Sequence, residues 1–316
     1  MALGPSPYFA DARVRQAFAY AVDRDALAQG LFGGAVSPLD SWLPPDHWAY
    51  AGEGTLPAYP FDPGRAAALL EEAGWSDLDG DGTREYSGAG GTYACQRGEW
   101  TIEPGTLLAP MLVIPAGDPL REQIALQMQA SLAQVGVNLQ VQPLDPALMF
   151  AASGPIVRRE FDLALFAALT RPDPGGIEQW VGADVFRHPL ERTVVHRWDL
   201  EARWLTSEQL VERLALNNVP GPENDYQGQN YSGWCNEAAD VAIVEAALSF
   251  DLQERAAFYA QQQAIFAQEL PVLPLFPRPR LAASAPYVCG VRPGPYDPLT
   301  WNIATWSFDE SGTCGG

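Results

Sequence analysis

One segment near the middle of the chain restricts the fold more than any other. Leu107 to Ile114 is an apolar run of strand length, and Asp118 then opens an amphipathic stretch that Gly136 closes. From Val137 to Gln142 apolar and polar residues alternate, which is typical of a half-buried strand. A strand, a helix and a second strand in this order predict parallel strands joined by a right-handed crossover. The segment therefore predicts an α/β fold.

Capping and turn residues predict further elements on both sides of this segment. Helices are expected where an N-cap residue precedes periodic apolar residues, and strands where short apolar runs lie between turns. Three helices are expected to begin directly after Asp11, Asp23 and Asp62. Three more are expected at about 207–216, 237–248 and 252–269. The expected strands cover 161–167 and 272–276.

The charge balance argues against two classes of partner. The 316 residues include 39 acids against 19 basic residues, all of them arginine, which gives a net charge of −20. Such a surface repels phosphate backbones and anionic lipid, so neither nucleic acid nor an anionic membrane surface is an expected partner. No apolar run reaches the length of a membrane span, and Met1 to Pro5 lacks the character of a signal peptide. We expect any signal or anchor to lie outside this chain.

Few residue patterns support an enzyme. The three histidines, His47, His188 and His196, form no H-E-x-x-H pattern, and the chain has no G-x-S-x-G elbow. Without lysine it has no Schiff-base nucleophile. We therefore expect a protein that is not an enzyme. Two alternatives stay open: a secreted hydrolase with an unrecognised carboxylate pair, since 39 acids produce many accidental pairs, and an acidic protein-interaction module.

An acidic turn carries the one sharp metal-binding pattern. Aspartates occupy positions 1, 3 and 5 and glycine position 6 of an EF-hand calcium loop, but Gly88 stands at position 12 in place of the bidentate glutamate. The candidate calcium ligands are Asp77, Asp79, Asp81, Thr83 and Glu85. The alternative is a turn whose carboxylates accept hydrogen bonds from their own backbone. No other cofactor is expected.

The four cysteines are too far apart in sequence for a metal site. Cys95, Cys235, Cys289 and Cys314 include no C-x-x-C pair, whereas two disulfides would place the protein in an oxidising compartment. Of the three possible connectivities we favour Cys289–Cys314 with Cys95–Cys235. Buried free thiols are the alternative.

Ligand-binding residues are expected beyond the carboxyl ends of the parallel strands, where α/β proteins bind their ligands. Loop tryptophans and tyrosines are further candidates because they stack on ligands, although core packing is the alternative for each. Mutual pairing on a solvated loop is the alternative for the charged residues. The candidates are Trp42, Ala116, Gly117, Asp118, Thr170, Arg171, Asp173, Tyr231 and Trp234.

Six segments resemble, in the same order, motifs of the family 5 solute-binding proteins, which are the peptide, oligopeptide and nickel receptors of ABC importers. The first resembles D-x-R-V-R-Q-A-x-x-Y-A-[IV]-[DN]-[RK], and the second Y-x-[YF]-D-P-x-[KR]-A-x-x-L-L-x-x-A-G-W. The third is the acidic turn, similar to D-x-D-G-D-G-x-R-[ED]. The matching residues are 11–24, 59–75, 77–85, 121–141, 230–236 and 269–275.

The resemblance implies one lobe of a two-lobed clamp, a type II (class C) periplasmic-binding-protein-like α/β lobe with a mixed sheet flanked by helices. Residues 1–285 would form the second, ligand-binding lobe, and residues 286–316 would return to a first lobe that is missing from this chain. The implied function is capture of a solute outside the membrane for ABC permease subunits. The implied location is extracytoplasmic, either periplasmic or anchored at the cell surface.

One departure from the family pattern concerns the ligand. Peptide-binding members carry an aspartate three residues before an [ED]-P pair, and it pairs with the amino terminus of the peptide. Here the pair is Asp173-Pro174, and Thr170 stands three residues before it. A hydroxyl group cannot neutralise an ammonium group. The expected ligand is therefore a peptide or another small polar solute.

Overall fold

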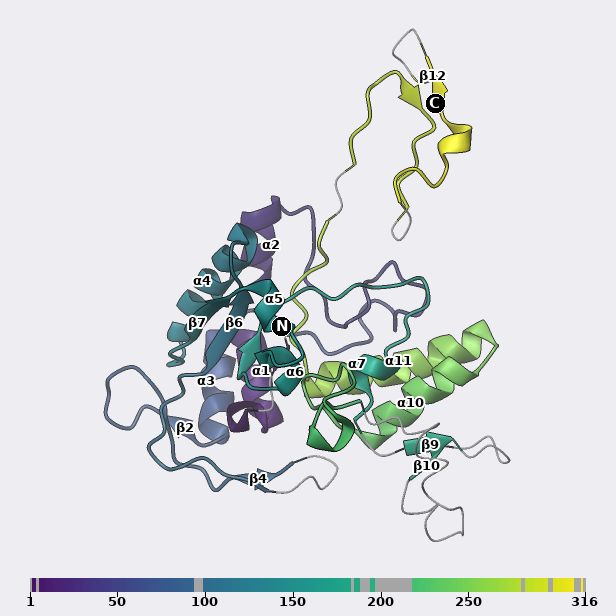
Figure 1. The fold of residues 1–316 in the computed structure, drawn as a ribbon. Coiled ribbons are helices and arrows are strands. Elements are labelled where there is room, and N and C mark those ends of the chain that lie inside the picture. Colours follow the sequence, from purple (N-terminus) through teal and green to yellow (C-terminus); the bar gives the residue numbers. More distant parts are fainter. Residues whose placement is uncertain are drawn as a thin grey trace. The chain divides into compact units, whose positions relative to one another are not determined.

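The computed structural model describes residues 2–3, 6–93, 99–182, 185–187, 194–196, 218–279, 282–294, 298–309 and 314, which are drawn in colour in Figure 1. They form two compact units. The first unit contains Met1–Ala167 and Gly175–Pro277, and the second contains Ala168–Pro174 and Arg278–Gly316. These units are not the lobes of a clamp into which we divided the chain at residues 1–285 and 286–316. That division stays a prediction.

A four-stranded mixed sheet lies in the first unit, with the strand order β1-β8-β6-β7. The strand β6 (Met111–Pro115) pairs in parallel with β7 (Gln140–Leu144) and with β8 (Leu163–Ala164). The fourth strand, β1 (Ala2–Leu3), pairs antiparallel with β8. The α/β class and the parallel pair expected from the central segment are confirmed. Both strands of that pair begin later than expected, at Met111 after a proline and at Gln140.

A single long helix, α4 (Pro119–Ala133), connects β6 to β7 and runs beside them in Figure 1. Asp118 caps it by accepting a hydrogen bond from the backbone N–H of Arg121 at 3.2 Å. After the helix, Gly136 takes a left-handed conformation with φ +79°, which favours glycine and ends the helix as predicted. The helix buries one face against the sheet through Ile124, Ala125, Met128 and Leu132.

Side chains of β6 alternate between two apolar clusters. Leu112 and Ile114 lie in the main core of the first unit, which also contains Trp75. Val113 lies in a second cluster, together with Ala164 of β8. Successive side chains of a strand point to opposite faces of the sheet, so the two clusters cover opposite faces.

Three helices of the amino-terminal part begin as the capping residues predict. They are α1 (Ala12–Ala21), α2 (Arg24–Phe32) and α3 (Pro63–Glu72). The side chains of Asp11, Asp23 and Asp62 each accept a hydrogen bond from a backbone N–H in the first turn. α1 and α3 pack on the main core through Phe18 and Leu70.

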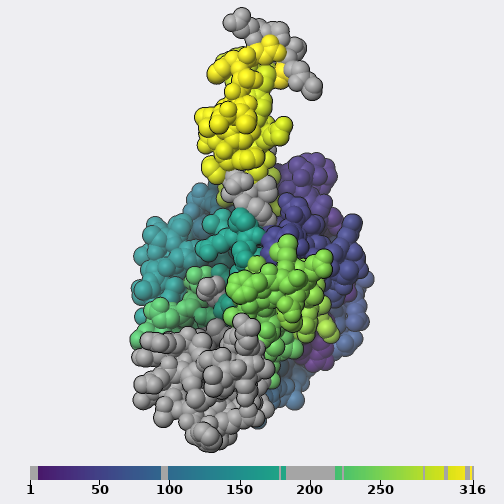
Figure 2. Space-filling view, turned by 90° about the vertical axis from the view of Figure 1, so that its right-hand side faces the viewer, coloured from purple at the N-terminus to yellow at the C-terminus, as the bar shows by residue number. Residues whose placement is uncertain are grey.

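Two further helices have the predicted bounds, α10 (Glu237–Leu248) and α11 (Leu252–Glu269). They pack against each other, and in green they form a broad part of the face shown in Figure 2. Asn236 caps α10 by accepting a hydrogen bond from Ala239 N–H, and Asp251 caps α11 by accepting hydrogen bonds from two N–H groups.

The remaining described elements of the first unit are short. Three antiparallel strand pairs are formed by β2 (Trp75–Ser76) with β3 (Glu85–Tyr86), by β4 (Gly91–Thr92) with β5 (Glu99–Trp100), and by β9 (Val185–Arg187) with β10 (Val194–His196). The short helical turns are η1 (Pro7–Phe9), α5 (Pro146–Met149), α6 (Pro155–Arg158), α7 (Ile177–Trp180) and η3 (Pro222–Asn224).

One strand prediction is wrong, and one helix prediction cannot be compared. Residues 272–276 form no strand, although Leu273 and Leu275 are buried to 1% and 8% exposure. Prolines at positions 271, 274 and 277 remove backbone N–H donors from this segment, so it forms no hydrogen-bonded ladder. The helix expected at 207–216 lies outside the described residues.

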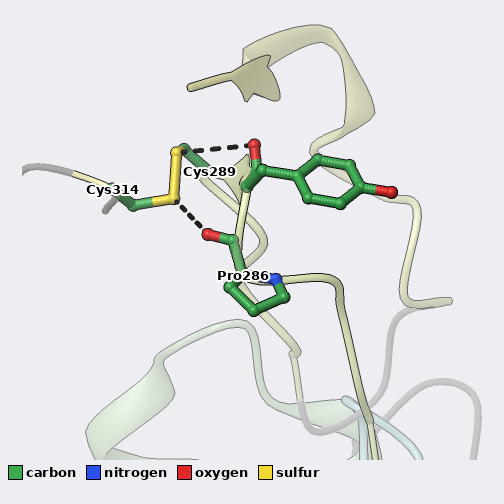
Figure 3. Close-up of a disulfide and its surroundings, with 4 residues drawn as sticks. Pro286, Cys289 and Cys314 are labelled. Carbon is green, nitrogen blue, oxygen red and sulfur yellow. Dashed lines mark hydrogen bonds between the residues drawn. A yellow bond between two sulfur atoms is a disulfide. The ribbon is translucent and has the colours of Figure 1, made fainter. Parts of the chain in front are cut away.

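The second unit contains a short antiparallel pair, β11 (Val288–Cys289) with β12 (Ser307–Phe308), and the turn η4 (Ile303–Thr305). The predicted Cys289–Cys314 disulfide is confirmed, with a separation of 25 residues along the chain. The Cys314 sulfur lies 3.4 Å from the carbonyl oxygen of Pro286, and a dashed line marks this contact in Figure 3. The predicted partner of Cys235, Cys95, lies outside the described residues, so that pair stays a prediction.

Candidate functional site

The three parallel strands end at one edge of the sheet. In the pairing register, Pro115 at the end of β6 stands opposite Leu144 at the end of β7, and Val113 of β6 stands opposite Ala164 at the end of β8. We call these strand ends, with the residues that follow them directly, the carboxyl edge. Ligands of open α/β sheets bind beyond such an edge because the loops there are free to vary while the strands hold them in place.

The structure places Ala116, Gly117 and Asp118 at the carboxyl edge, as expected. Ala116 and Gly117 are exposed, and a β-carbon built on Gly117 would meet no atom within 4 Å. The carboxylate of Asp118 is already engaged, because it caps α4 and forms an ion pair with the guanidinium of Arg121. Backbone and small side chains, rather than a free charge, are therefore what this loop presents to solvent.

Aromatic and aliphatic side chains form an apolar surface beside this loop, which we call the edge patch: Leu144, Phe150, Phe166 and Tyr231. Leu144, Phe166 and Tyr231 are partly buried against the cluster that contains Val113. Phe150 is 42% exposed, and its ring meets that of Phe166 edge-on, with centroids 5.7 Å apart. The patch offers a ligand an apolar contact surface at the carboxyl edge.

Tyr231 adds a polar group to the edge patch. Its phenol O–H can donate a hydrogen bond, and burial raises the pKa of the phenol above the ordinary value. Its backbone carbonyl accepts a hydrogen bond from Arg159 Nε at 3.3 Å, which fixes the loop that carries it. Of the three aromatic residues predicted to bind ligand, Tyr231 is the one at this patch.

Sequence reasoning missed Leu144, Phe150 and Phe166. The available signal was Asp145-Pro146, a helix-start dipeptide that directly follows the alternating strand and marks where the strand ends. The Asp145 side chain accepts a hydrogen bond from Ala147 N–H at 2.8 Å and so begins α5 at the edge.

The other two predicted aromatic residues lie in packing contacts. Trp42 donates from Nε1 to Gln262 Oε1 at 2.8 Å, and its ring lies 5.7 Å from that of Trp180. Trp234 is only 6% exposed and donates from Nε1 to Glu269 Oε2 at 2.6 Å. These contacts favour the packing alternative for both tryptophans.

The segment around Trp234 is held together by its own side chains. Asn230 is fully buried and donates from Nδ2 to the carbonyl oxygens of Val181 and Trp234. The hydroxyl of Ser232 donates to Asn230 Oδ1 at 2.9 Å and accepts from Trp234 N–H. These hydrogen bonds connect the segment that precedes α10 with Val181, which directly follows α7.

Thr170, Arg171 and Asp173 belong to the second unit, in the segment Ala168–Pro174. Thr170 is partly buried, whereas Arg171 and Asp173 are exposed. Their role in ligand binding stays a prediction.

The acidic residues of the predicted metal site do come together. One carboxylate oxygen from each of Asp77, Asp79, Asp81 and Glu85 lies within 4.8 Å of the others. The N–H of Thr83 donates to Asp81 Oδ1 at 2.7 Å, so Thr83 lies in the same turn. The turn connects β2 to β3, and none of the edge-patch residues belongs to it.

None of the helices in the described part of the chain has the length and apolar character needed to cross a bilayer.

Comparison with known proteins gives concordant matches. Residues 2–183 match the family described as bacterial extracellular solute-binding proteins, family 5 Middle. A Brucella ovis protein, named as a putative ABC transporter peptide-binding protein, is 30% identical over 179 residues, which cover 54% of this chain and 27% of that protein. Di/tripeptide-binding protein 2 of Pseudomonas aeruginosa is 24% identical over 294 residues, 91% of this chain and 41% of that protein.

Solved structures agree with the sequence matches. The oligopeptide-binding protein of Thermus thermophilus, complexed with a pentapeptide, aligns with a TM-score of 0.63 at 25% identity. The alignment covers 84% of this chain and 37% of that protein. The chain thus spans between about a quarter and two fifths of the length of these relatives.

Proposed function

The chain belongs to the bacterial extracellular solute-binding proteins of family 5, and on that basis we propose that it captures a solute outside the cytoplasmic membrane for uptake by an ABC importer. The observation that carries the proposal is the extent of the family match. Residues 2–183 include β1, β6, β7 and β8, so the matched part contains the whole four-stranded sheet and its carboxyl edge. The proposed role is binding without chemical conversion of the solute.

The edge patch supports a peptide as the solute. Phe150, Phe166 and Leu144 offer apolar contact to side chains of a peptide, and the Tyr231 hydroxyl offers a hydrogen-bond donor for a carbonyl group. A net charge of −20 disfavours an anionic solute. The proposed ligand is therefore a short neutral or cationic peptide, with another small polar solute that has an apolar portion as the second choice.

The amino terminus of such a peptide would need a partner other than Thr170, whose hydroxyl carries no charge. The permease subunits of the importer are the proposed protein partners, and the proposed location is the periplasm or an anchored position at the outer surface.

A binding titration with a matched pair of variants tests the proposal. Phe150 exposes 42% of its surface, about 80 Å² that a ligand can cover, and at about 25 cal/mol per Å² this contact contributes about 2 kcal/mol. Phe150→Ala is therefore expected to weaken peptide binding at least tenfold in isothermal titration calorimetry with a panel of di- to pentapeptides. The control is Phe250→Ala between α10 and α11, because Phe250 is 99% exposed and lies outside the edge patch.

Uptake by cells gives the second readout. Deleting the gene in the source organism is expected to reduce uptake of the peptide that binds best, and the Phe150→Ala gene is expected to restore uptake less well than the unaltered gene. Unchanged uptake of every peptide in the panel would contradict the importer role. Multiple-turnover cleavage of a panel peptide by the purified protein would favour the hydrolase alternative.

A further inference from the structure

The turn between β2 and β3 is organised around its own carboxylates. We call residues 77–85 the acidic turn. Both carboxylate oxygens of Asp77 accept backbone hydrogen bonds, from Gly80 N–H at 2.8 Å and Gly82 N–H at 3.1 Å. Gly80 and Gly82 have φ values of +81° and +93°, a conformation that L side chains rarely adopt. The backbone therefore wraps around the aspartates and brings them to one side.

The carboxylate oxygens gather at a spacing that suits one cation. Four of them, from Asp77, Asp79, Asp81 and Glu85, lie within 4.8 Å of one another. Calcium binds oxygen at about 2.3–2.6 Å, so two oxygens on opposite sides of the ion are about 5 Å apart. Asp79 and Asp81 each use Oδ1 to accept one backbone N–H, at 3.1 and 2.7 Å, and their Oδ2 atoms accept none among the described residues. Those oxygens remain available to an ion.

Glu85 gives independent support, because it is buried in the protein rather than exposed like the aspartates. Its exposure is 7%, and Oε2 accepts a hydrogen bond from Leu78 N–H at 2.7 Å. Its other oxygen, Oε1, is buried and has no hydrogen-bond partner within the described ranges. A buried carboxylate oxygen without a partner is costly, and coordination to a metal ion is one of the ways in which proteins satisfy it.

The arginine next to Glu85 does not supply a compensating charge. Arg84 donates from Nε to the carbonyl oxygen of Val135 at 2.7 Å and from Nη1 to that of Trp75 at 2.8 Å. Its ion pair is with Glu71, at 3.5 Å. The guanidinium of Arg84 is thus committed to the main core, and Glu85 forms no ion pair among the described residues.

We propose that the acidic turn binds one calcium ion through the carboxylates of Asp77, Asp79, Asp81 and Glu85. Thr83 occupies the position at which an EF-hand loop supplies a backbone carbonyl. Glu85 comes from the strand that follows the turn and takes the place of the glutamate that the EF-hand pattern requires at position 12, where this chain has Gly88. An all-oxygen, mostly carboxylate site that is not rigidly octahedral favours calcium over magnesium.

The bound ion stabilises the first unit through the strands that flank the turn. Trp75 of β2 and Tyr86 of β3 are 1% and 2% exposed, and their rings lie 4.9 Å apart in the main core. The ion holds the two strand ends together from outside the core. Calcium removal therefore loosens the β2–β3 pair first, and it leaves the carboxyl edge as it is.

Calcium titration of the purified protein tests the proposal with matched variants. Calorimetry in calcium-free buffer is expected to show one calcium ion per chain, and calcium is expected to raise the Tm by about 3 °C or more, with reversal by EGTA. Glu85→Gln keeps the shape of the side chain but removes its charge, and the double variant Asp79→Asn/Asp81→Asn leaves the backbone-accepting oxygens in place. Each is expected to weaken calcium binding at least tenfold. Glu103→Gln, an exposed acid outside the turn, is the control and is expected to bind as the parent does.

The outcomes separate the site from a general effect of acidic charge. If calcium does not bind at millimolar concentration, or if Glu103→Gln weakens binding as much as Glu85→Gln does, the proposal is wrong. Circular dichroism in EGTA shows whether each variant is folded; a folded Glu85→Gln protein with unchanged calcium affinity also overturns it. Binding of magnesium with equal or greater affinity would contradict the assignment to calcium.

Discussion

Arg24 is the buried side chain whose removal gives the sharpest test of how the first unit is held together. It begins α2 and is 6% exposed. Its guanidinium donates to the carbonyl oxygens of Leu39 at 2.5 Å, Pro274 at 3.1 Å and Tyr59 at 3.2 Å. An ion pair with Asp40, at 3.5 Å, is the longest of these contacts. Arg24 thus connects three segments that are distant in sequence. Burial lowers the pKa of its guanidinium from the ordinary value.

Arg24→Met keeps most of the apolar stem and removes the guanidinium. Hydrogen bonds to a charged group contribute about 1.5–3 kcal/mol each, but the desolvation of the arginine offsets part of their sum. The carbonyl groups left behind lose their donors, and removing one partner from a buried charged network typically costs about 3–5 kcal/mol. We therefore expect a loss of about 4 kcal/mol in the free energy of unfolding, or about 10 °C in Tm.

Urea unfolding followed by tryptophan fluorescence measures this loss. Arg65→Met is the control, because its arginine is 50% exposed and pairs with Glu72 at 3.7 Å; the expected loss there is below about 1 kcal/mol. Asp40→Asn separates the ion pair from the carbonyl contacts and is expected to cost less than half as much as Arg24→Met. If Arg24→Met costs no more than Arg65→Met, the carbonyl contacts do not hold the segments together. If Asp40→Asn matches Arg24→Met, the ion pair dominates instead.

Two further predictions concern backbone strain and alkaline pH. Gly136 has φ +79°, and Gly136→Ala would place a β-carbon 2.8 Å from Cγ of Arg84, a side chain held by its hydrogen bond to the carbonyl oxygen of Val135. We expect this substitution to lower the free energy of unfolding by about 2–3 kcal/mol. Gly105→Ala, at φ +83° with nothing within 4 Å, is expected to cost about 1 kcal/mol, and equal losses in urea unfolding would refute the steric argument. Burial raises the pKa of Tyr59 from 10.0 to about 12, so its contribution to stability is complete below pH 10 and is lost as the pH rises towards 12. Tyr59→Phe also loses the hydrogen bond to Ala267 O, and its stability is expected to decline less steeply between pH 10 and 12 than that of the unaltered protein. An equally steep decline in the two proteins would contradict the assignment of this pH dependence to Tyr59.

Much of the helical structure could be predicted from the sequence because the signals are local. Asp62, Pro63 and Gly74 mark α3, and Asn236 marks the start of α10, through hydrogen bonds within a few residues of the chain. The acidic turn was predictable for the same reason, since its aspartates and glycines are adjacent in sequence. The strand expected at 272–276 failed because a strand needs a partner ladder, and the prolines at 271, 274 and 277 remove the N–H donors that this buried segment would need to form one.

The candidate site depended on contacts that no local pattern encodes. By itself, the sequence determined where the carboxyl edge would lie, because a strand–helix–strand unit places its strand ends on one side. Only the tertiary structure decided which side chains line that edge. It brought Phe166 and Tyr231 to the same apolar cluster from positions far apart in the chain, while Trp234 was buried against Glu269. Packing between distant segments is a property of the folded core, so it selects among aromatic residues that look alike in the sequence.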